Sequence, residues 1–238
     1  MLSSKLPHWL LPFTCVLCHR PGHADLDLCE ACYHELPWIS GACENCALPI
    51  PEGKICGECI KNPHSYQSIL ALWLYKQPID HFITNLKFQN QLLFSRLLGT
   101  LLFQKVKTTY QDKPLPTCII PVPLHRSRLK ERGFNQALEI ARPLSKNFKI
   151  AIDTTHCTRI KATAAQSSLL SLHERRRNIK NAFHINPLFQ AKHVAIVDDV
   201  VTTGHTVDEL SKALTLIGVE KIDIWCCAKT ELFTTYSV

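Results

Sequence analysis

The chain has 238 residues, of which 46% are apolar and 20% are charged, so it fits one sizeable core with a small additional module and is not a disordered chain. The net charge of +7 is unevenly placed, because residues 120–180 hold 13 of the 27 Lys and Arg but only 4 of the 20 Asp and Glu. That asymmetry predicts a polyanionic ligand or partner.

The amino-terminal segment, residues 1–13, is apolar but short, and Pro7 and Pro12 interrupt it. No small-residue cleavage site follows, so a signal peptide is not expected. No apolar run reaches about 18 residues, and a membrane span is not predicted either. Cysteines that do not form disulfides, together with the lack of an export signal, predict a reducing compartment, the cytoplasm.

Eight of the 12 cysteines form four C-x-x-C pairs, all before residue 60. Each pair lets two thiolates reach one ion, and four thiolates complete a closed tetrahedral zinc site with no position for water. Two structural zinc sites are therefore predicted, with the pairs combined either sequentially or in a crossed arrangement. The predicted ligands are Cys15, Cys18, Cys29, Cys32, Cys43, Cys46, Cys56 and Cys59. The remaining four, Cys118, Cys157, Cys226 and Cys227, are predicted to be buried small hydrophobes.

Residues 1–62 lack long apolar periods and are predicted to be a zinc-stapled module, a double zinc ribbon. Residues 63–238 form a second predicted domain in which strands and helices alternate. Residues 66–76 are predicted to be either a strand pair or a strand leading into a helix. Further strands are predicted at 118–122, 193–197 and 220–228, with another near 150–152 or 155–160. Its helices are predicted at 79–106, 136–146 and 205–217. This order predicts an α/β fold with a doubly wound parallel sheet.

Residues 194–206 carry the most specific signal in the chain. An apolar strand ends at Asp198 and Asp199, a Thr-Thr-Gly turn follows, and a helix begins. Backbone N–H groups at such a turn bind phosphate, and the two acids would accept hydrogen bonds from ribose hydroxyls. The predicted ligand-binding residues are Asp198, Asp199, Val200, Val201, Thr202, Thr203, Gly204, His205 and Thr206. The alternatives are that the acids cap the next helix or bind magnesium and that the turn is only a turn.

Two basic clusters account for the excess charge. The first, Arg126, Arg128, Lys130 and Arg132, follows a predicted strand and would either neutralise pyrophosphate or contact a nucleic-acid backbone. The second, Arg175, Arg176, Arg177 and Lys180, is a candidate DNA-binding cluster, with a solvated face as the alternative. Aromatic residues are sparse in both, so no stacking platform for bases is predicted, and DNA binding should be mainly electrostatic.

Residues 194–206 resemble the 13-residue ligand motif of type I phosphoribosyltransferases. Together with residues 121–136, residues 166–183 and the Cys pairs, they make nearly the whole chain similar to the ComF family (ComFC and GntX-like proteins). One departure is Asn181, where family members often have Gly.

The resemblance implies a type I phosphoribosyltransferase-like domain behind the zinc module. It also implies that Asp198 and Asp199 hold the ribose of phosphoribosyl pyrophosphate (PRPP), that residues 202–206 hold its 5′-phosphate, and that magnesium accompanies the ligand. The family is associated with uptake of single-stranded DNA during natural transformation, on the cytoplasmic side. The expected partners are therefore single-stranded DNA and DNA-uptake or recombination proteins.

Two functions remain as hypotheses. The first is a competence factor that binds PRPP and single-stranded DNA, and it is the one we favour. The alternative is an active phosphoribosyltransferase without a DNA role, for which the acceptor and the catalytic residues are unassigned, because fold does not decide function.

Overall fold

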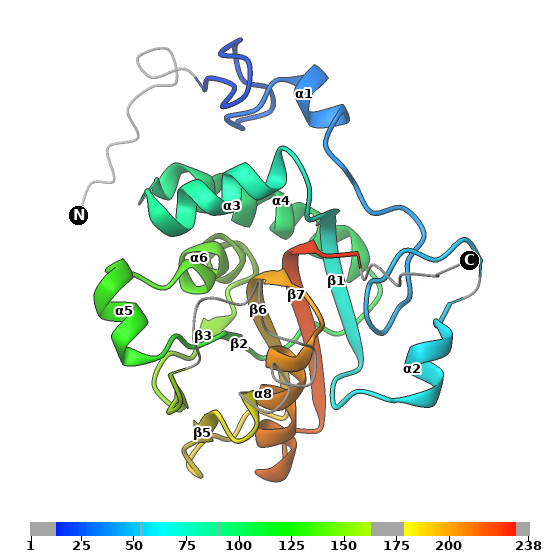
Figure 1. The fold of residues 1–238 in the computed structure, drawn as a ribbon, viewed down its shortest axis with the longest axis vertical. Helices are drawn as coiled ribbons and strands as arrows, with labels where there is room; N and C mark the ends of the chain where they lie inside the picture. Colours follow the sequence, from blue (N-terminus) through cyan, green and yellow to red (C-terminus); the bar gives the residue numbers. More distant parts are fainter. Residues whose placement is uncertain (1–12, 53, 90, 163–178, 232–238) are drawn as a thin grey trace, which may run out of the picture. The chain divides into compact units, whose positions relative to one another are not determined.

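The computed structural model describes residues 13–52, 54–89, 91–162 and 179–231 (Figure 1). The chain divides into two compact units, residues 1–37 and 38–238. The first unit contains the first four cysteine ligands and the short helix α1 (Glu30–His34). The second unit contains the second cysteine cluster, α2 (Gly57–Lys61) and the α/β domain. A domain division at residue 62 stays a prediction.

The core of the second unit is a five-stranded parallel sheet in the order β1-β7-β6-β2-β3. Its strands are β1 (Ser68–Leu74), β2 (Cys118–Pro121), β3 (Ala151–Ile152), β6 (His193–Val201) and β7 (Lys221–Lys229). The register places Pro121 beside Val197 and Asp198 beside Cys226. The carboxyl ends of β2, β6 and β7 therefore lie along one edge of the sheet.

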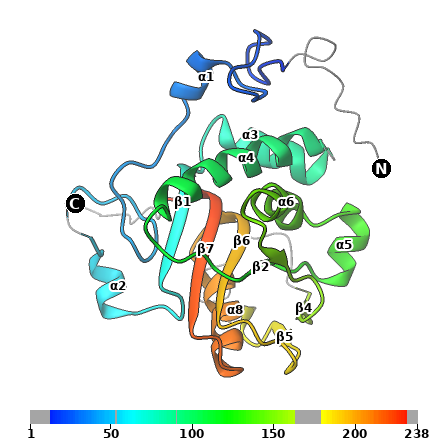
Figure 2. The same cartoon turned by 180° about the vertical axis from the view of Figure 1, so that it is seen from behind.

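Helices cover both faces of this sheet. α8 (His205–Leu216) packs on one face, where Leu210 and Leu214 join Ile224 in the core (Figure 1). α4 (Leu92–Thr109) and α6 (Gln136–Phe148) lie over the other face (Figure 2). On that side Trp225 Nε1 donates a hydrogen bond of 3.2 Å to the hydroxyl of Tyr110 at the end of α4. The predicted doubly wound α/β fold with a Cys-rich zinc-ribbon module is confirmed.

The long helix predicted at 79–106 is two helices, α3 (Ile79–Phe88) and α4. The break follows the polar run Gln89-Asn90-Gln91, where the apolar pattern loses its phase: Leu86 is fully buried, whereas Leu93 is exposed. The first basic cluster, which follows β2, lies on a short helix that was not predicted, α5 (Arg126–Arg132). Gly133 ends it in the left-handed conformation, at φ 80°.

A two-stranded antiparallel sheet, β4 (Cys157–Arg159) with β5 (Phe183–Ile185), stands apart from the central sheet. β3 and β4 correspond to the two alternative short strands of the prediction, and both exist. Asn181, just before β5, has φ 53°, in the left-handed region that glycine favours and asparagine tolerates. The departure from the family pattern at this position therefore preserves the backbone geometry.

β6 is longer than predicted. It runs to Val201, so Asp198 and Asp199 lie inside the strand rather than after its end. Pairing with β7 continues through Val201 and Lys229, which keeps both acids within the hydrogen-bonded ladder. Cys118, Cys157, Cys226 and Cys227 are buried, as predicted. Among the helices of the described ranges, none combines the length and apolar character needed to cross a bilayer.

Candidate functional site

The eight cysteines of the C-x-x-C pairs form two clusters, Cys15, Cys18, Cys29 and Cys32, and Cys43, Cys46, Cys56 and Cys59. In each, the sulfur atoms all lie within 4.8 Å of one another. The Sγ–Sγ distance is 3.5 Å between Cys18 and Cys29 and 3.7 Å between Cys46 and Cys56. A tetrahedral zinc ion requires sulfurs about 3.8 Å apart. The clusters therefore fit two structural zinc ions, in the sequential pairing.

Backbone amides favour the thiolate form of one cysteine in each cluster, Cys15 and Cys43. Burial alone would raise the pKa of Cys43, but backbone N–H groups, including that of Cys56 at 3.2 Å, lower it to about 7. Amide donors likewise overcome burial at Cys15 and lower its pKa to about 6. Thiolates are the form that zinc binds, and with four of them per ion neither site has an open position for catalysis.

Asp198 and Asp199 are buried side by side at the carboxyl edge of the sheet, and their settings differ. Lys87, from α3, forms an ion pair with Asp199 Oδ2. Gln136, the first residue of α6, lies with its Nε2 3.4 Å from Asp199 Oδ1. Asp198 forms no ion pair with the residues that the structure describes, and its Oδ1 accepts a hydrogen bond of 2.9 Å from the backbone N–H of Asp199.

These settings shift the pKa values of the two acids in opposite directions. Burial, with the neighbouring Asp199 charge, raises the pKa of Asp198 well above its usual range. Burial would also raise the pKa of Asp199, but the Lys87 ammonium outweighs it and lowers that pKa below its usual value. The pKa of Asp198 is therefore raised while that of Asp199 is lowered, so Asp198 is the carboxyl that binds a proton more readily and Asp199 the one that keeps its charge.

Lys229 stabilises the turn between β6 and α8. This lysine ends β7 and is only 2% exposed. Its ammonium donates to the carbonyl of Thr202 and, at 3.4 Å, to that of Thr230. Gly204, in the left-handed conformation at φ 81°, is the N-cap of α8, and no side chain caps the helix. The amide groups of the first turn of α8 therefore keep their hydrogen-bonding capacity for a ligand.

Tyr66 directs its hydroxyl at this turn. Its oxygen would lie 3.3 Å from a Cβ atom built on Gly204. The side chain is only 4% exposed, and its hydroxyl has no hydrogen-bond partner within the part of the chain that the structure describes. Burial raises the pKa of Tyr66, so the phenol stays protonated and can donate. A buried donor without a partner costs stability, and a ligand oxygen at the turn would supply the partner.

The segment that carries Tyr66 also joins the second cysteine cluster to α8. The backbone N–H of Ser65 donates to Asp208 Oδ1 at 2.9 Å, in the first turn of α8. The ring of His64 stacks on that of Tyr66, with centroids 4.7 Å apart. This segment follows α2 and Cys59 directly, so the second cluster anchors the chain that supports the turn.

α5 sorts its four basic residues onto two faces. Arg126 and Lys130, four positions apart, are exposed, whereas Arg128 and Arg132 are partly buried. Arg132 Nη1 donates to Gln136 Oε1 at 2.7 Å, and Gln136 in turn contacts Asp199. Burial lowers the pKa of Arg159 in β4. The positive charge of Arg128 lowers this pKa further, and the negative charge of Asp198 opposes the shift. The inner face thus belongs to the acid site and the outer face to solvent.

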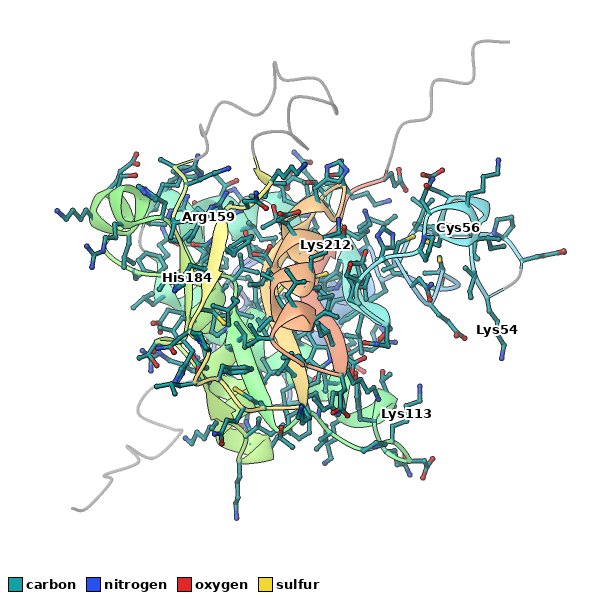
Figure 3. All side chains as sticks on the ribbon, turned by 90° about the horizontal axis from the view of Figure 1, so that it is seen from below. Lys54, Cys56, Lys113, Arg159, His184 and Lys212 are labelled. Carbon is teal, nitrogen blue, oxygen red and sulfur yellow. The ribbon has the colours of Figure 1, made fainter. Side chains whose placement is uncertain are left out.

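A cavity of about 730 Å³ lies between α5 and the β4–β5 sheet, next to the end of β2. Its apolar lining includes Leu124, Leu129, Phe134 and Ile160, and its polar lining includes His125, Asp153 and Arg159. Arg159 is labelled on β4 in Figure 3, with His184 on the neighbouring strand. Asp153 is committed to local contacts, because its carboxylate accepts from the backbone N–H groups of Thr155 and His156 at 2.9 Å.

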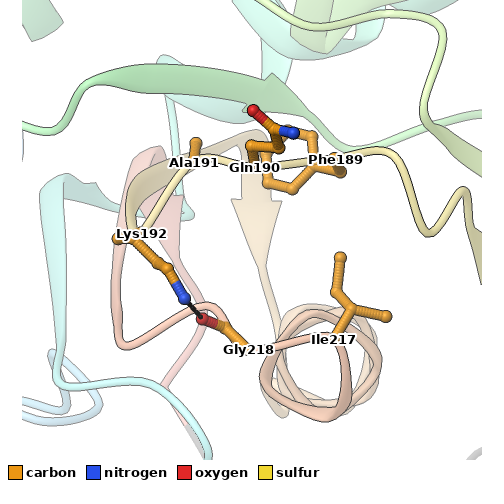
Figure 4. A pocket seen from close by; sticks show the side chains of 6 residues that line it. All are labelled: Phe189, Gln190, Ala191, Lys192, Ile217 and Gly218. Atoms are coloured by element: carbon orange, nitrogen blue, oxygen red, sulfur yellow. Dashed lines mark hydrogen bonds between the residues drawn. The ribbon is translucent and has the colours of Figure 1, made fainter.

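A smaller cavity of about 340 Å³ lies at the opposite, amino-terminal edge of the sheet (Figure 4). It is lined by residues 189–192 and 217–218, and Lys192 Nζ donates to the carbonyl of Gly218 at 3.0 Å. None of the predicted ligand residues lines it.

The remaining predicted site residues lie in different environments. Val200 is half-buried and Val201 is buried, so the side chain of Val201 belongs to the core. The hydroxyl of Thr203 lies 2.9 Å from His205 Nδ1, inside the turn. Lys180 is exposed, and its carbonyl accepts from Lys161 Nζ at 2.5 Å. Arg175, Arg176 and Arg177 lie outside the described residues.

The sequence analysis missed Lys87, Tyr66, Lys229 and, as a site residue, Gln136. Lys87 lies in a predicted helix and Lys229 at the end of an apolar strand, so the sequence is compatible with each being an ordinary lysine exposed to solvent. The only available signal was one charge within an apolar run, which is too common to identify a site.

Comparisons with known proteins agree with these features. A family model described as a double zinc ribbon domain matches residues 6–60. The DNA utilization protein YhgH of Escherichia coli K12 is 35% identical over 228 residues, which cover 92% of this chain and 98% of that protein. Competence protein F of Haemophilus influenzae is 37% identical over 225 residues, covering 91% and 97%.

Two more distant matches were found. Competence protein ComFC of Bacillus subtilis is 22% identical over 197 residues, which cover 80% of this chain and 78% of that protein. A solved structure, TT1426 from Thermus thermophilus, matches at a TM-score of 0.32 and 13% identity, over 60% of this chain and 86% of that one. The structural match is too weak to carry an argument.

Proposed function

The chain belongs to the ComF family, and from this membership together with the site geometry we propose that it is a cytoplasmic competence factor that binds PRPP and single-stranded DNA. Curated relatives that match along nearly their whole length are named a competence protein and DNA utilization proteins. The proposal assigns PRPP to the carboxyl edge of the sheet and DNA to the basic surface beside it.

One observation carries the ligand assignment: two buried acids, one with a raised and one with a lowered pKa, lie next to a helix N-terminus without a side-chain cap, and the buried Tyr66 hydroxyl, which has no partner among the described residues, points at it. Vicinal ribose hydroxyls each donate and accept, so Asp198, whose pKa is raised, beside Asp199, whose pKa is lowered, complements such a diol. The turn at residues 202–204 and the Tyr66 hydroxyl complement a phosphate. Ribose 5-phosphate contains both groups, because its vicinal hydroxyls and its phosphate are carried by one sugar.

The pyrophosphate of PRPP is assigned to the guanidinium groups of Arg128 and Arg132 on the inner face of α5, whose positive charge would offset that of the phosphates. Magnesium bound with PRPP would supply further charge neutralisation. The two acids themselves are poorly suited to a cation, because Lys87 already balances Asp199 and burial favours the neutral form of Asp198.

The alternative function, an active phosphoribosyltransferase with an unidentified acceptor, is favoured by the cavity of about 730 Å³ beside the end of β2. Arg159, which lines this cavity, interacts electrostatically with Asp198. The lining is partly apolar and partly polar, and the cavity is large enough for a small molecule. In that reaction the acceptor would displace pyrophosphate from the anomeric carbon, and the arginines would stabilise the departing charge.

Calorimetric titration of magnesium PRPP into the zinc-loaded protein tests the proposal. We expect the wild type to bind and the double variant Asp198→Asn/Asp199→Asn to lose binding, because amides cannot reproduce the charged acceptor. Tyr66→Phe should weaken binding about fivefold to tenfold, the effect of one hydrogen bond.

The matched control is Asp223→Asn. Asp223 is also a buried carboxylate of the central sheet, but it lies near the amino-terminal end of β7, where His193 Nε2 contacts it at 2.7 Å. It should bind PRPP as the wild type does. Normal binding by the double variant, with the fold intact by circular dichroism, would refute the assignment of the two acids.

A further inference from the structure

Phe88 is an aromatic side chain in an unusual position. It is the last residue of α3, and 72% of it is exposed. Leu92 and Leu93, at the start of α4, are 50% and 42% exposed, so three large apolar side chains stand in solvent within six residues of chain. Single exposed apolar residues are ordinary, but a group of them indicates an interaction surface.

A guanidinium group backs the ring of Phe88. The Cζ atom of Arg132 lies 5.6 Å from the ring centroid, within the range of a cation–π contact. Arg132 is itself fixed by its hydrogen bond to Gln136, at 2.7 Å. One face of the ring is therefore held by a residue with restricted motion, which prepares the ring as a rigid contact.

The surroundings of the ring are positively charged. Arg132 ends α5, whose outer face presents Arg126 and Lys130 to solvent, and the only acid in this helix is Glu131. An apolar platform beside a row of cations suits a partner that combines planar apolar groups with regularly spaced anions. Single-stranded nucleic acid has this chemistry, because its bases stack on aromatic rings while its phosphates contact cations.

The platform is connected to the candidate ligand site by two routes. Lys87, the residue before Phe88, forms the ion pair with Asp199. Arg132, behind the ring, reaches the same carboxylate through Gln136. The ring thus lies at the rim of the site proposed for PRPP. Phe88 follows Lys87 in the chain, its ring contacts Arg132, and both routes lead to Asp199.

We propose that Phe88, backed by Arg132, is a base-stacking platform for single-stranded nucleic acid, whose phosphates contact Arg126 and Lys130 on the outer face of α5. This inference rests on the DNA-binding part of the proposed function and adds a non-electrostatic contact to it. Sequence analysis had no means of finding the platform, because Phe88 lies 38 positions before Arg126 and outside both basic clusters.

The test measures fluorescence anisotropy of a fluorescein-labelled oligothymidylate against the full-length, zinc-loaded protein at several salt concentrations. Phe88→Ala should weaken binding about tenfold, the typical effect of losing one base-stacking contact. The slope of log affinity against log salt should not change, because the phenyl ring carries no charge. Phe88→Trp should retain wild-type affinity, because a larger ring still stacks.

The matched control is Leu216→Ala, which removes an even more exposed apolar side chain (87%) from the end of α8. It should bind the oligonucleotide as the wild type does. PRPP binding by Phe88→Ala is measured in parallel and should be retained. Loss of both ligands would mean that Phe88 acts through the acid site and would overturn the platform.

The remaining outcomes separate the two levels of the proposal. If the wild type binds the oligonucleotide and Phe88→Ala binds it equally well, the platform is wrong and the electrostatic DNA surface stands. If the wild type does not bind it, the DNA-binding part of the proposed function fails, and the platform fails with it. If Phe88→Ala leaves DNA binding intact but abolishes self-association in analytical ultracentrifugation, the patch is a protein contact.

Discussion

Asp198 and Asp199 are consecutive in one strand, yet the folded protein raises the pKa of the first and lowers that of the second. The difference comes from a single cation, because Lys87 contacts Asp199 and not Asp198 among the ion pairs of the described chain. Breaking a buried ion pair from one side leaves an uncompensated charge, which costs far more than the pair contributes in total. Lys87 is therefore the residue on which the lowered pKa of Asp199 depends.

We predict that Lys87→Met lowers the free energy of unfolding by roughly 3 kcal/mol at neutral pH. The pKa of Asp199 is lowered on folding, so its stabilising effect is present above its unfolded pKa, about 3.9, and is lost as the pH falls through the folded pKa. The stability difference between Lys87→Met and the wild type should accordingly shrink in acid. Urea denaturation over a pH series measures it.

The control for this prediction is a double-mutant cycle. Lys87→Met/Asp199→Asn removes both charges, so it should recover much of the stability that Lys87→Met loses. A double variant no more stable than Lys87→Met would show that Lys87 contributes through packing and not through the ion pair.

α5 shows how secondary structure divides a cluster that looks uniform in the sequence. Four basic residues at alternate positions would all be equivalent in an extended loop. In a helix, the pairs four positions apart share a face, which directs Arg128 and Arg132 inward and Arg126 and Lys130 outward. The two roles that the sequence left open, pyrophosphate and nucleic-acid backbone, can thus be divided between the faces of one helix.

We predict different effects for the two pairs. Arg126→Gln/Lys130→Gln should weaken oligonucleotide binding and flatten its salt dependence by roughly 1 to 1.5 in the log–log slope, since two phosphate contacts to a single strand are lost. Arg128→Gln/Arg132→Gln should weaken PRPP binding more than the outer pair does. Anisotropy and calorimetry of both variants measure these effects. An equal loss of both ligands in both variants would contradict a division by face.

At the scale of the whole molecule, the two cysteine clusters have different neighbours. The second cluster lies in the same compact unit as the α/β domain, and the chain leaving it carries Ser65 and Tyr66 to the turn at residues 202–204. Ligation energy at a structural zinc site is folding energy for the segment around it. Zinc in the second cluster should therefore stabilise the segment that supports the ligand site.

We predict that Cys59→Ser weakens PRPP binding, whereas Cys15→Ser does not. Both residues are buried cluster ligands, so Cys15→Ser is the matched control for loss of one zinc ion. Zinc content by atomic absorption and PRPP affinity by calorimetry are measured on the same samples. Equal PRPP affinities in the two variants, each having lost one zinc ion, would show that the second cluster does not support the ligand site.

Local patterns in the sequence were sufficient for much of this protein. The four C-x-x-C pairs predicted both metal clusters, because two thiolates in a tight turn can be recognised within four residues of chain. The alternation of strands and helices predicted the sheet, and the Asp-Asp and Thr-Thr-Gly segment predicted which strand end to examine. The predicted end of that strand was less accurate, since continued pairing with β7 extends β6 through the two acids.

Only the tertiary structure decided which charges lie beside the two acids and which side chains surround the site. Lys87, Tyr66, Lys229 and Phe88 come from elements far from residues 194–206 in the chain, and each resembles an ordinary helix, strand or loop residue in its local context. Their roles depend on long-range packing, which brings a cation to one acid, a hydroxyl to the turn and a ring to a guanidinium group. The amino-acid sequence by itself determined the fold class, the metal ligands and the location of the acids, because these depend on local spacing. The charge of each acid and the surface around the site depend on distances between separate elements, and those distances exist only in the folded chain.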